Sequence, residues 1–292
     1  MKKPVLTKAE DRTIPAQWHP TSGPPESWLN SGISFDFFIN WKTYAVQQEI
    51  WVKRLLDEDE LLPEREICNY LEANDSAFAD LCNFASTYRF DLHYILFDDT
   101  QNWNDDNSVL FDLHYTGGSW INEKIDLANV KARICRLSGG KMRIGGKGLT
   151  LSTSNLETAL AKTDYPWPGD VDAIILHKET KIPLAMLEYR KHTKESDFTS
   201  VQGYYINYSD KRKYDRLQLL KTAINPDLPL IVVTFPTSAK IYEVLLESIK
   251  VEAGNMIIEE RVRCRLPDNA NQGKEYKAGI YGIIKKHKII GI

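Results

Sequence analysis

VDAIILHKETKIPLAMLEYR, residues 171–190, is the stretch that decides the fold. It contains two apolar runs of strand length, 171–177 and 182–190, joined by the short polar turn KETK. Such a pattern is typical of a β-hairpin. Asp172 lies near the start of the first run and Glu188 near the end of the second. Because hairpin strands are antiparallel, these positions meet at one end, and the sequence predicts two neighbouring carboxylates.

The segments around this hairpin predict helices and one further strand. Ser154 and Glu157 have capping-box spacing, which indicates a helix that begins there and runs to about residue 162. After the hairpin, helical patterns cover about 198–208 and 214–223, and the continuous apolar run LPLIVVTFP at 228–236 is typical of a buried central strand. We therefore expect an α/β (α+β) fold with a mixed central sheet flanked by helices.

The remaining chain is expected to surround this core. The predicted organisation is an extended arm at 1–33, an N-terminal α+β region with a helical and β-hairpin content at 34–125, the core at 126–238, and a C-terminal helix and strands at 239–292. Within these regions the patterns indicate helices at about 35–56, 64–71, 76–87, 126–137 and 240–250, and strands at 90–99, 108–115, 257–266 and about 278–290.

Composition limits the class of protein. The chain has 292 residues, a net charge of −3, and four cysteines without a CxxC pair, which argues against a zinc site and fits a reducing compartment. No signal peptide and no membrane-spanning run are recognisable, so a cytoplasmic protein with no membrane association is expected. Residues 131–221 hold 17 Lys or Arg and 10 Asp or Glu, whereas residues 1–130 hold 10 and 22. The basic segment suits nucleic acid, or it packs against the acidic one.

The two carboxylates of the hairpin predict a metal site. Paired carboxylates are ligands that Mg²⁺ accepts, and Mn²⁺ can replace it. Asp170 competes with Asp172 for the first ligand position, because it lies two residues earlier on the same face. Arg190 shares the face of Glu188, whereas Lys191 points the other way unless a bulge rotates it.

These motifs resemble the PD-(D/E)XK nuclease superfamily. Asp172, followed sixteen residues later by the LEYRK segment of Glu188, is similar to the Asp and Glu-x-Lys signature on two adjacent strands. Gln202 and Tyr205 resemble a Gln-x-x-Tyr pattern on the next helix, and Glu157 resembles the acidic residue that often precedes the Asp. The resemblance covers about 130–238 and implies a restriction-endonuclease-like core.

The resemblance implies a metal-dependent nuclease that hydrolyses phosphodiester bonds, with DNA favoured over RNA, of a restriction-modification or defence type. Asp172, Glu188 and Glu157 would hold Mg²⁺. Arg190 or Lys191 would neutralise the phosphate or orient water, and Gln202 would position the substrate. A homodimer is one compatible assembly. The side chains expected to contact nucleic acid are Lys141, Arg143, Lys147, Tyr205, Lys211, Arg212 and Arg216.

One departure from the superfamily keeps alternatives open. The signature places a lysine at position 190, where this chain has Arg190 with Lys191 next to it. Arginine holds phosphate but does not deprotonate in proteins. A catalytically inactive subunit that binds nucleic acid or supports an assembly is therefore the alternative. An interaction protein with an accidental motif is the third hypothesis, favoured by the acidic N-terminal region.

Overall fold

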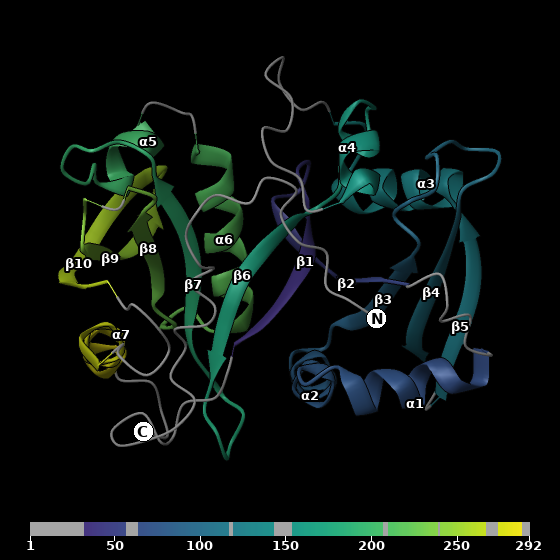
Figure 1. The fold of residues 1–292 in the computed structure, drawn as a ribbon, viewed down its shortest axis with the longest axis horizontal. Helices are drawn as coiled ribbons and strands as arrows, with labels where there is room; N and C mark the ends of the chain where they lie inside the picture. The colour runs from purple at the N-terminus through teal and green to yellow at the C-terminus, as the bar shows by residue number, and fades with distance from the viewer. Residues whose placement is uncertain are drawn as a thin grey trace. The chain divides into compact units, whose positions relative to one another are not determined.

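A computed structural model describes residues 32–56, 64–116, 119–142, 154–206, 210–238, 240–266 and 274–287. The chain divides into two compact units, and the division falls after Asp170, inside strand β6. Unit 1 covers residues 35–170 and unit 2 covers residues 171–292. Both contain a sheet flanked by helices, so the expected α/β class with a mixed sheet is confirmed (Figure 1).

Unit 1 contains five strands in the order β1-β2-β3-β4-β5. Strands β2 and β3 are parallel, and the other neighbouring pairs are antiparallel. The parallel pair requires a crossover, which the two helices α1 and α2 provide. The elements are β1 (Ile33–Asn40), β2 (Ala45–Leu55), α1 (Glu64–Asn74), α2 (Phe78–Tyr88), β3 (Asp91–Phe97), β4 (Val109–Thr116), β5 (Ser119–Asp126), α3 (Leu127–Ser138) and α4 (Asn155–Ala161).

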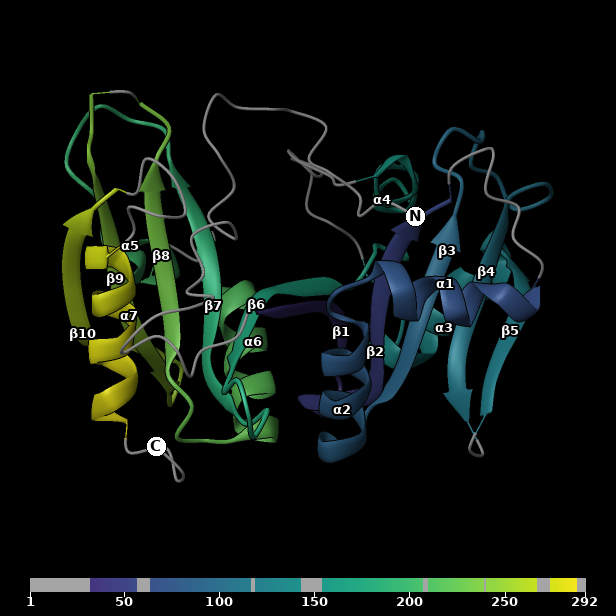
Figure 2. The ribbon, with the colours of Figure 1, turned by 60° about the horizontal axis from the view of Figure 1, so that its bottom comes forward.

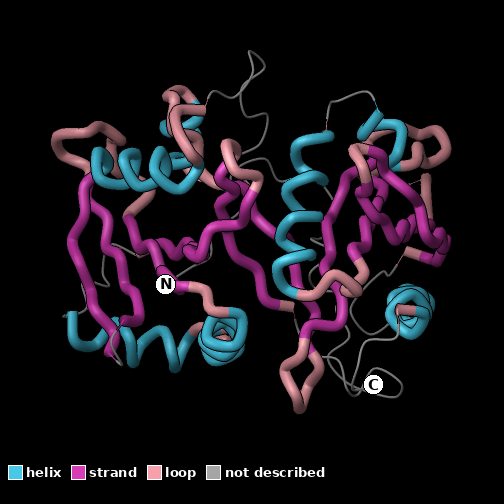
Figure 3. Tube along the Cα trace, turned by 180° about the vertical axis from the view of Figure 1, so that it is seen from behind, coloured by secondary structure: helices cyan, strands magenta, loops and turns pink. Residues whose placement is uncertain are grey.

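Helices cover both faces of the sheet of unit 1. Figures 1 and 3 show α1 and α2 on one side of these strands and α3 and α4 on the other. On the α2 side, the rings of Phe78 and Tyr94 lie 5.6 Å apart. On the α3 side, Trp51 and Ile95 pack with Leu156 of α4 in one buried apolar cluster. Burial on both faces explains why these strands are apolar almost throughout.

Unit 2 repeats this arrangement in the same order along the chain. Its strands follow the order β6-β7-β8-β9-β10, with β7 and β8 parallel and the other neighbouring pairs antiparallel. Two helices again form the crossover, and a last helix follows the last strand. The elements are β6 (Gly169–Leu176), β7 (Pro183–His192), α5 (Val201–Ile206), α6 (Lys211–Ile224), β8 (Leu230–Pro236), β9 (Glu243–Glu252), β10 (Asn255–Arg265) and α7 (Lys274–Lys286).

Alternation along β7 assigns its side chains to the two faces of unit 2. Glu188 and Arg190 point toward α6 and α5, where they contact Lys213 and Tyr204. Tyr189 points the other way, toward Tyr276 of α7. Figure 2 shows α7 running beside β9 and β10. The candidate site therefore lies on the α5–α6 face of this sheet.

Several secondary-structure expectations are confirmed, and three are wrong. The predicted hairpins at 90–115 and 171–190, the helices near 127–138 and 211–224, and the strand at 230–236 are present. The helix expected at 35–56 is instead the hairpin β1–β2, the helix expected at 240–250 is strand β9, and the strand expected at 278–290 is replaced by α7. Strand β5 was not expected.

The wrong assignments have a common physical reason. Strands β1 and β9 are buried on both faces, so their apolar residues do not alternate and can be read as helical. Conversely, α7 buries Tyr276, Ile280, Ile283 and Ile284, which is one face of a helix rather than an alternating strand. None of the described helices is long and apolar enough to cross a membrane.

Candidate functional site

The two predicted metal ligands lie next to each other in unit 2. The β6–β7 ladder pairs Ala173 with Leu187, and Asp172 and Glu188 are the next positions along the two strands. The backbone N–H of Tyr189 donates a hydrogen bond of 2.6 Å to Oδ2 of Asp172. Glu188 is only 1% exposed, whereas Asp172 is half-buried. The hairpin thus presents one buried and one accessible carboxylate at the same end.

Lys213 of α6 is the base that contacts this pair. Its ammonium forms an ion pair with Oε1 of Glu188. Burial opposes the charge of the lysine, but the carboxylates of Glu188 and Asp172 hold the pKa of Lys213 above its ordinary value. Lys213 therefore stays protonated at neutral pH and offsets the negative charge of the site. An Asp, a Glu and a Lys are brought together from two strands and one helix.

The two strand bases, Arg190 and Lys191, are placed differently from each other. The guanidinium carbon of Arg190 lies 3.4 Å from the ring centroid of Tyr204, and its Nη1 donates to the carbonyl of Thr199 at 3.2 Å. The β7–β8 register runs without a shift from Glu188 to Lys191. No bulge rotates Lys191, so it points to the face opposite Glu188. Without a bulge at this position, Lys191 does not share the face of Glu188.

The predicted helix residues make contacts within unit 2. The amide of Gln202 donates to the carbonyl of Met256 at 2.8 Å, which ties α5 to β10. The hydroxyl of Tyr205 donates to Asp215 at 2.7 Å and accepts from Lys211 at 2.5 Å. These contacts join α5 to α6. Among the described contacts of Gln202, Tyr205 and Lys211, none is to Asp172 or Glu188.

The remaining predicted residues are scattered. Arg212 and Arg216 lie on α6, where Arg212 is exposed and Arg216 half-buried. Lys141 lies in unit 1, with its ammonium 6.0 Å from the ring centroid of Tyr165. Arg143 and Lys147 fall outside the described residues.

Glu157, the third predicted metal ligand, belongs to a cluster in unit 1. It is the first-turn acid of α4, whose N-cap Ser154 accepts from the Glu157 N–H at 3.2 Å, as the capping-box spacing predicted. Its carboxylate forms an ion pair with Lys53 of β2, and Lys53 lies 3.4 Å from Asp36 of β1. Lys53 thus forms ion pairs with both Glu157 and Asp36.

Asp36 has an unusual acidity within this cluster. Burial raises the pKa of Asp36 to about 7; Lys53 opposes this rise, and the carboxylates of Asp170 and Glu157 add to it. Conversely, burial would lower the pKa of Lys53, but the same three carboxylates hold it above its ordinary value. The cluster contains three acids around one lysine, so a proton shared near neutral pH relieves their repulsion.

The role of Lys213 was not apparent from the sequence. The basic run at 211–216 predicts contacts with the phosphates of nucleic acid. A weak signal exists, because α6 buries Tyr214, Leu217 and Leu220, and Lys213 borders that stripe. The pairing with Glu188 depends on the crossover between parallel strands, which is a tertiary feature.

No family model matches this sequence, and searches of curated proteins and of solved structures found no match.

Proposed function

We propose that this protein is a divalent-metal-dependent nuclease that hydrolyses phosphodiester bonds of nucleic acid, with DNA the favoured substrate. The observation that carries the proposal is the meeting of Asp172, Glu188 and Lys213 on one face of the unit 2 sheet. Two carboxylates with a neighbouring ammonium match the chemistry of metal-assisted phosphoryl transfer. The resemblance to the PD-(D/E)XK superfamily points to the same reaction.

The donor set fits Mg²⁺. Asp172 and Glu188 offer hard oxygen ligands at the end of a hairpin, and Asp172 is partly accessible to solvent. When bound, Mg²⁺ supplies Lewis acidity and lowers the pKa of a coordinated water.

The residues of the chain have separate tasks in this proposal. Asp172 is oriented by the N–H of Tyr189, and its carboxylate would hold the cation. Lys213 pairs with Glu188 and would supply a fixed positive charge that stabilises negative charge developing on the phosphate. Arg190, held over Tyr204, adds a second positive charge on the same face.

Cleavage of plasmid DNA, single-stranded DNA and RNA with Mg²⁺ or Mn²⁺ tests this function. The wild type should cleave at least one of these substrates, and chelation should stop it. Asp172→Asn and Glu188→Gln should each lower kcat by on the order of 10²-fold or more, because charge stabilisation in the transition state is lost. Glu179→Gln, at an exposed position in the turn of the same hairpin, is the matched control and should retain full activity.

A catalytically inactive nucleic-acid-binding subunit is the second candidate. The observation that favours it is that Lys213 and Arg190 are both engaged, with Glu188 and with Tyr204 and Thr199. Binding to labelled DNA, measured by fluorescence anisotropy, separates the two functions. Salt-dependent binding without any metal-dependent cleavage would support this candidate and reject the nuclease.

A further inference from the structure

A cluster of metal-binding side chains lies in unit 1, apart from the residues of the proposed nuclease site. The segment FDLHY occurs twice, at 90–94 and 111–115, on the neighbouring strands β3 and β4. The ladder pairs His93 with His114, and Asp112 lies two residues before His114. Paired residues and i, i+2 positions share a face, so all three side chains point to the same side of the sheet.

The geometry brings the donor atoms together. Nδ1 of His93 lies 2.8 Å from Oδ1 of Asp112, and Nδ1 of His114 lies 3.6 Å from Oδ2 of the same carboxylate. The two imidazole centroids are 4.9 Å apart. One donor atom from each residue lies within 4.8 Å of the others. Ligands of one tetrahedral zinc ion, each at about 2.0–2.2 Å, lie roughly 3.3–3.6 Å apart, so the three side chains would have to shift by about an ångström to bind one ion.

His114 supplies a second, independent observation. Its Nδ1 is buried from solvent and has no hydrogen-bond partner among the described residues; Oδ2 of Asp112 lies 3.6 Å away. A buried nitrogen without a hydrogen bond costs about 1–3 kcal/mol. Such a group requires an explanation, and a bound ion is one of the standard ones. A metal ion would take up the lone pair of this nitrogen.

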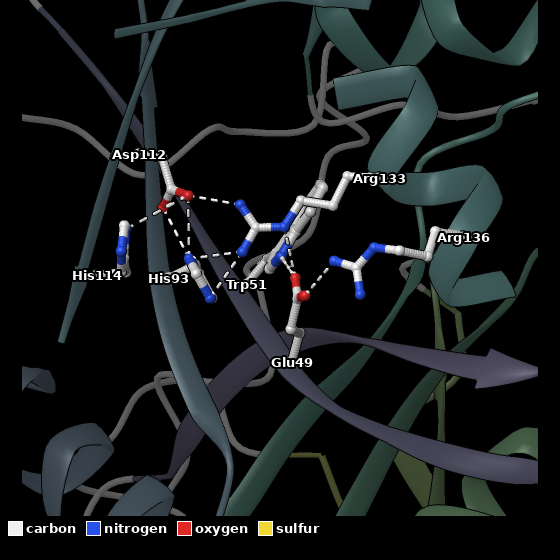
Figure 4. A network of polar contacts seen from close by, with 7 residues as sticks. All are labelled: Glu49, Trp51, His93, Asp112, His114, Arg133 and Arg136. Atoms are coloured by element: carbon white, nitrogen blue, oxygen red, sulfur yellow. Dashed lines mark hydrogen bonds and ion pairs between the residues drawn. The ribbon is translucent and has the colours of Figure 1, made fainter. Parts of the chain in front are cut away.

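Arg133 of α3 competes for the same ligands (Figure 4). Its Nη1 donates to Asp112 at 2.5 Å, its Nη2 lies 2.7 Å from His93, and its Nε donates to Glu49 at 2.6 Å. Arg136 also binds Glu49, at 2.7 Å. An ion would have to displace Arg133 from His93, while the contact with Glu49 keeps the guanidinium attached to the sheet.

We propose that His93, Asp112 and His114 form a transition-metal site that takes Zn²⁺, with Arg133 as a competing internal cation. Two imidazoles and one carboxylate suit Zn²⁺ and related divalent ions, whereas Mg²⁺ prefers oxygen ligands alone. Three protein ligands leave a coordination position for water or another small ligand. The site is independent of the nuclease proposal, because it shares no residue with it.

Zn²⁺ titration of the chelator-treated full chain, in competition with a chromophoric chelator, tests the site. The wild type should bind one Zn²⁺ at this site. His114→Ala should weaken binding by at least about tenfold, and Arg133→Gln should tighten it, because the competing cation is gone. His287→Ala, at the residue that directly follows α7 in unit 2, is the control and should bind as the wild type does.

The absorption spectrum of the Co²⁺-substituted protein tests whether cysteines bind the metal. We expect no thiolate-to-metal charge-transfer band, and the presence of such a band would overturn the assignment. Circular dichroism confirms that each variant is folded. His114→Ala is suited to this test because Nδ1 of His114 makes no hydrogen bond that the substitution would break. Equal Zn²⁺ affinity of the wild type and His114→Ala, or an absence of binding by both, would refute the proposal.

Discussion

Glu188 is a nearly fully buried carboxylate, and Lys213 is the cation that forms an ion pair with it. Removal of one member of a buried pair leaves an uncompensated charge, which costs more than the pair contributes. Because the side chain of Lys213 is 40% exposed, solvent screens part of this cost. The same pair that serves the proposed chemistry therefore also affects stability.

Lys213→Met should lower the free energy of unfolding by about 1–3 kcal/mol, less than for a fully buried pair. The double variant Glu188→Gln/Lys213→Met should be more stable than Lys213→Met alone, because no buried charge remains. Urea denaturation of the wild type, Glu188→Gln, Lys213→Met and the double variant gives the coupling energy between the two residues. Lys178→Met, at an exposed position in the turn between β6 and β7, serves as the control, and strictly additive effects would contradict the coupling.

Asp36 should make stability depend on pH. Its pKa is raised from 3.8 to about 7 in the folded protein. Between these values the folded state holds a proton that the unfolded chain has lost, so the free energy of unfolding falls as the pH rises through this window. At about 1.4 kcal/mol per pKa unit, the loss relative to Asp36→Asn should be on the order of 1–4 kcal/mol.

Chemical denaturation of the wild type and Asp36→Asn at pH 4 to 8 measures this effect as a difference, which removes other titrating groups. The free energy of unfolding of the wild type minus that of Asp36→Asn should fall up to about pH 7 and then level off. The exposed Asp91 provides a control, Asp91→Asn. A constant difference between wild type and Asp36→Asn over the whole range would disprove the raised pKa of Asp36.

At the scale of elements, the short helix α5 depends on a side chain from a neighbouring strand. Glu247 of β9 is fully buried and accepts hydrogen bonds from the hydroxyl of Ser200 at 2.7 Å and the N–H of Val201 at 2.9 Å. Arg261 of β10 also binds this carboxylate, at 2.7 Å. Glu247 thus fixes the start of the helix that carries Tyr204, the partner of Arg190.

Glu247→Gln should therefore destabilise unit 2 and loosen α5. The loss of the charge from these bonds should cost about 1.5–3 kcal/mol. Hydrogen exchange should rise at residues 201–206, and the proposed cleavage activity should fall in parallel. Glu243→Gln, an exposed position on the same strand, is the matched control. Unchanged exchange at α5 would show that Glu247 does not hold the helix.

How far the sequence predicted the site depends on the distance along the chain between the interacting elements. The proximity of Asp172 and Glu188 follows from a hairpin with a short turn, and it was predicted. Lys213 reaches Glu188 only through the crossover between β7 and β8, so no local pattern could assign it. Glu157 was placed correctly on its helix, but its partner Lys53 lies 104 positions away in sequence.

The strands show the same limit. Hairpins with visible turns were recognised, whereas β1 and β9 were read as helices because both of their faces are buried. Burial of the second face depends on helices contributed by distant segments. Periodicity alone therefore cannot separate such strands from helices.

At the scale of the whole molecule, both units share an order of elements: a hairpin, two helices, a strand parallel to the second hairpin strand, and two antiparallel strands. Helices α3 and α4 follow in unit 1, and α7 follows in unit 2. Their faces differ in chemistry. In unit 2 the face toward the crossover helices carries Glu188 and Lys213. In unit 1 the corresponding face carries Arg54, bound to Asp75 at 3.0 Å. The two units thus share a topology but differ in the charged residues on this face.

This division predicts that two metals act separately. The proposed Zn²⁺ ligands all belong to unit 1, and the proposed Mg²⁺ ligands Asp172 and Glu188 belong to unit 2. Ligands that bind only the folded state raise stability, by about 2.7 kcal/mol at a concentration 100 times Kd. His114→Ala should abolish the Zn²⁺-dependent rise in Tm while Mg²⁺-dependent cleavage persists. Glu188→Gln should do the reverse.

Thermal denaturation with and without Zn²⁺, run beside the cleavage assay for both variants, checks this separation. If folded His114→Ala loses cleavage while Zn²⁺ is absent from the assay, the histidine belongs to the nuclease mechanism and the two sites are one system. If Glu188→Gln loses the Zn²⁺ effect, the ion binds in unit 2. A structural or regulatory metal in unit 1 and a catalytic metal in unit 2 are supported only if His114→Ala loses the Zn²⁺ effect but keeps cleavage and Glu188→Gln loses cleavage but keeps the Zn²⁺ effect.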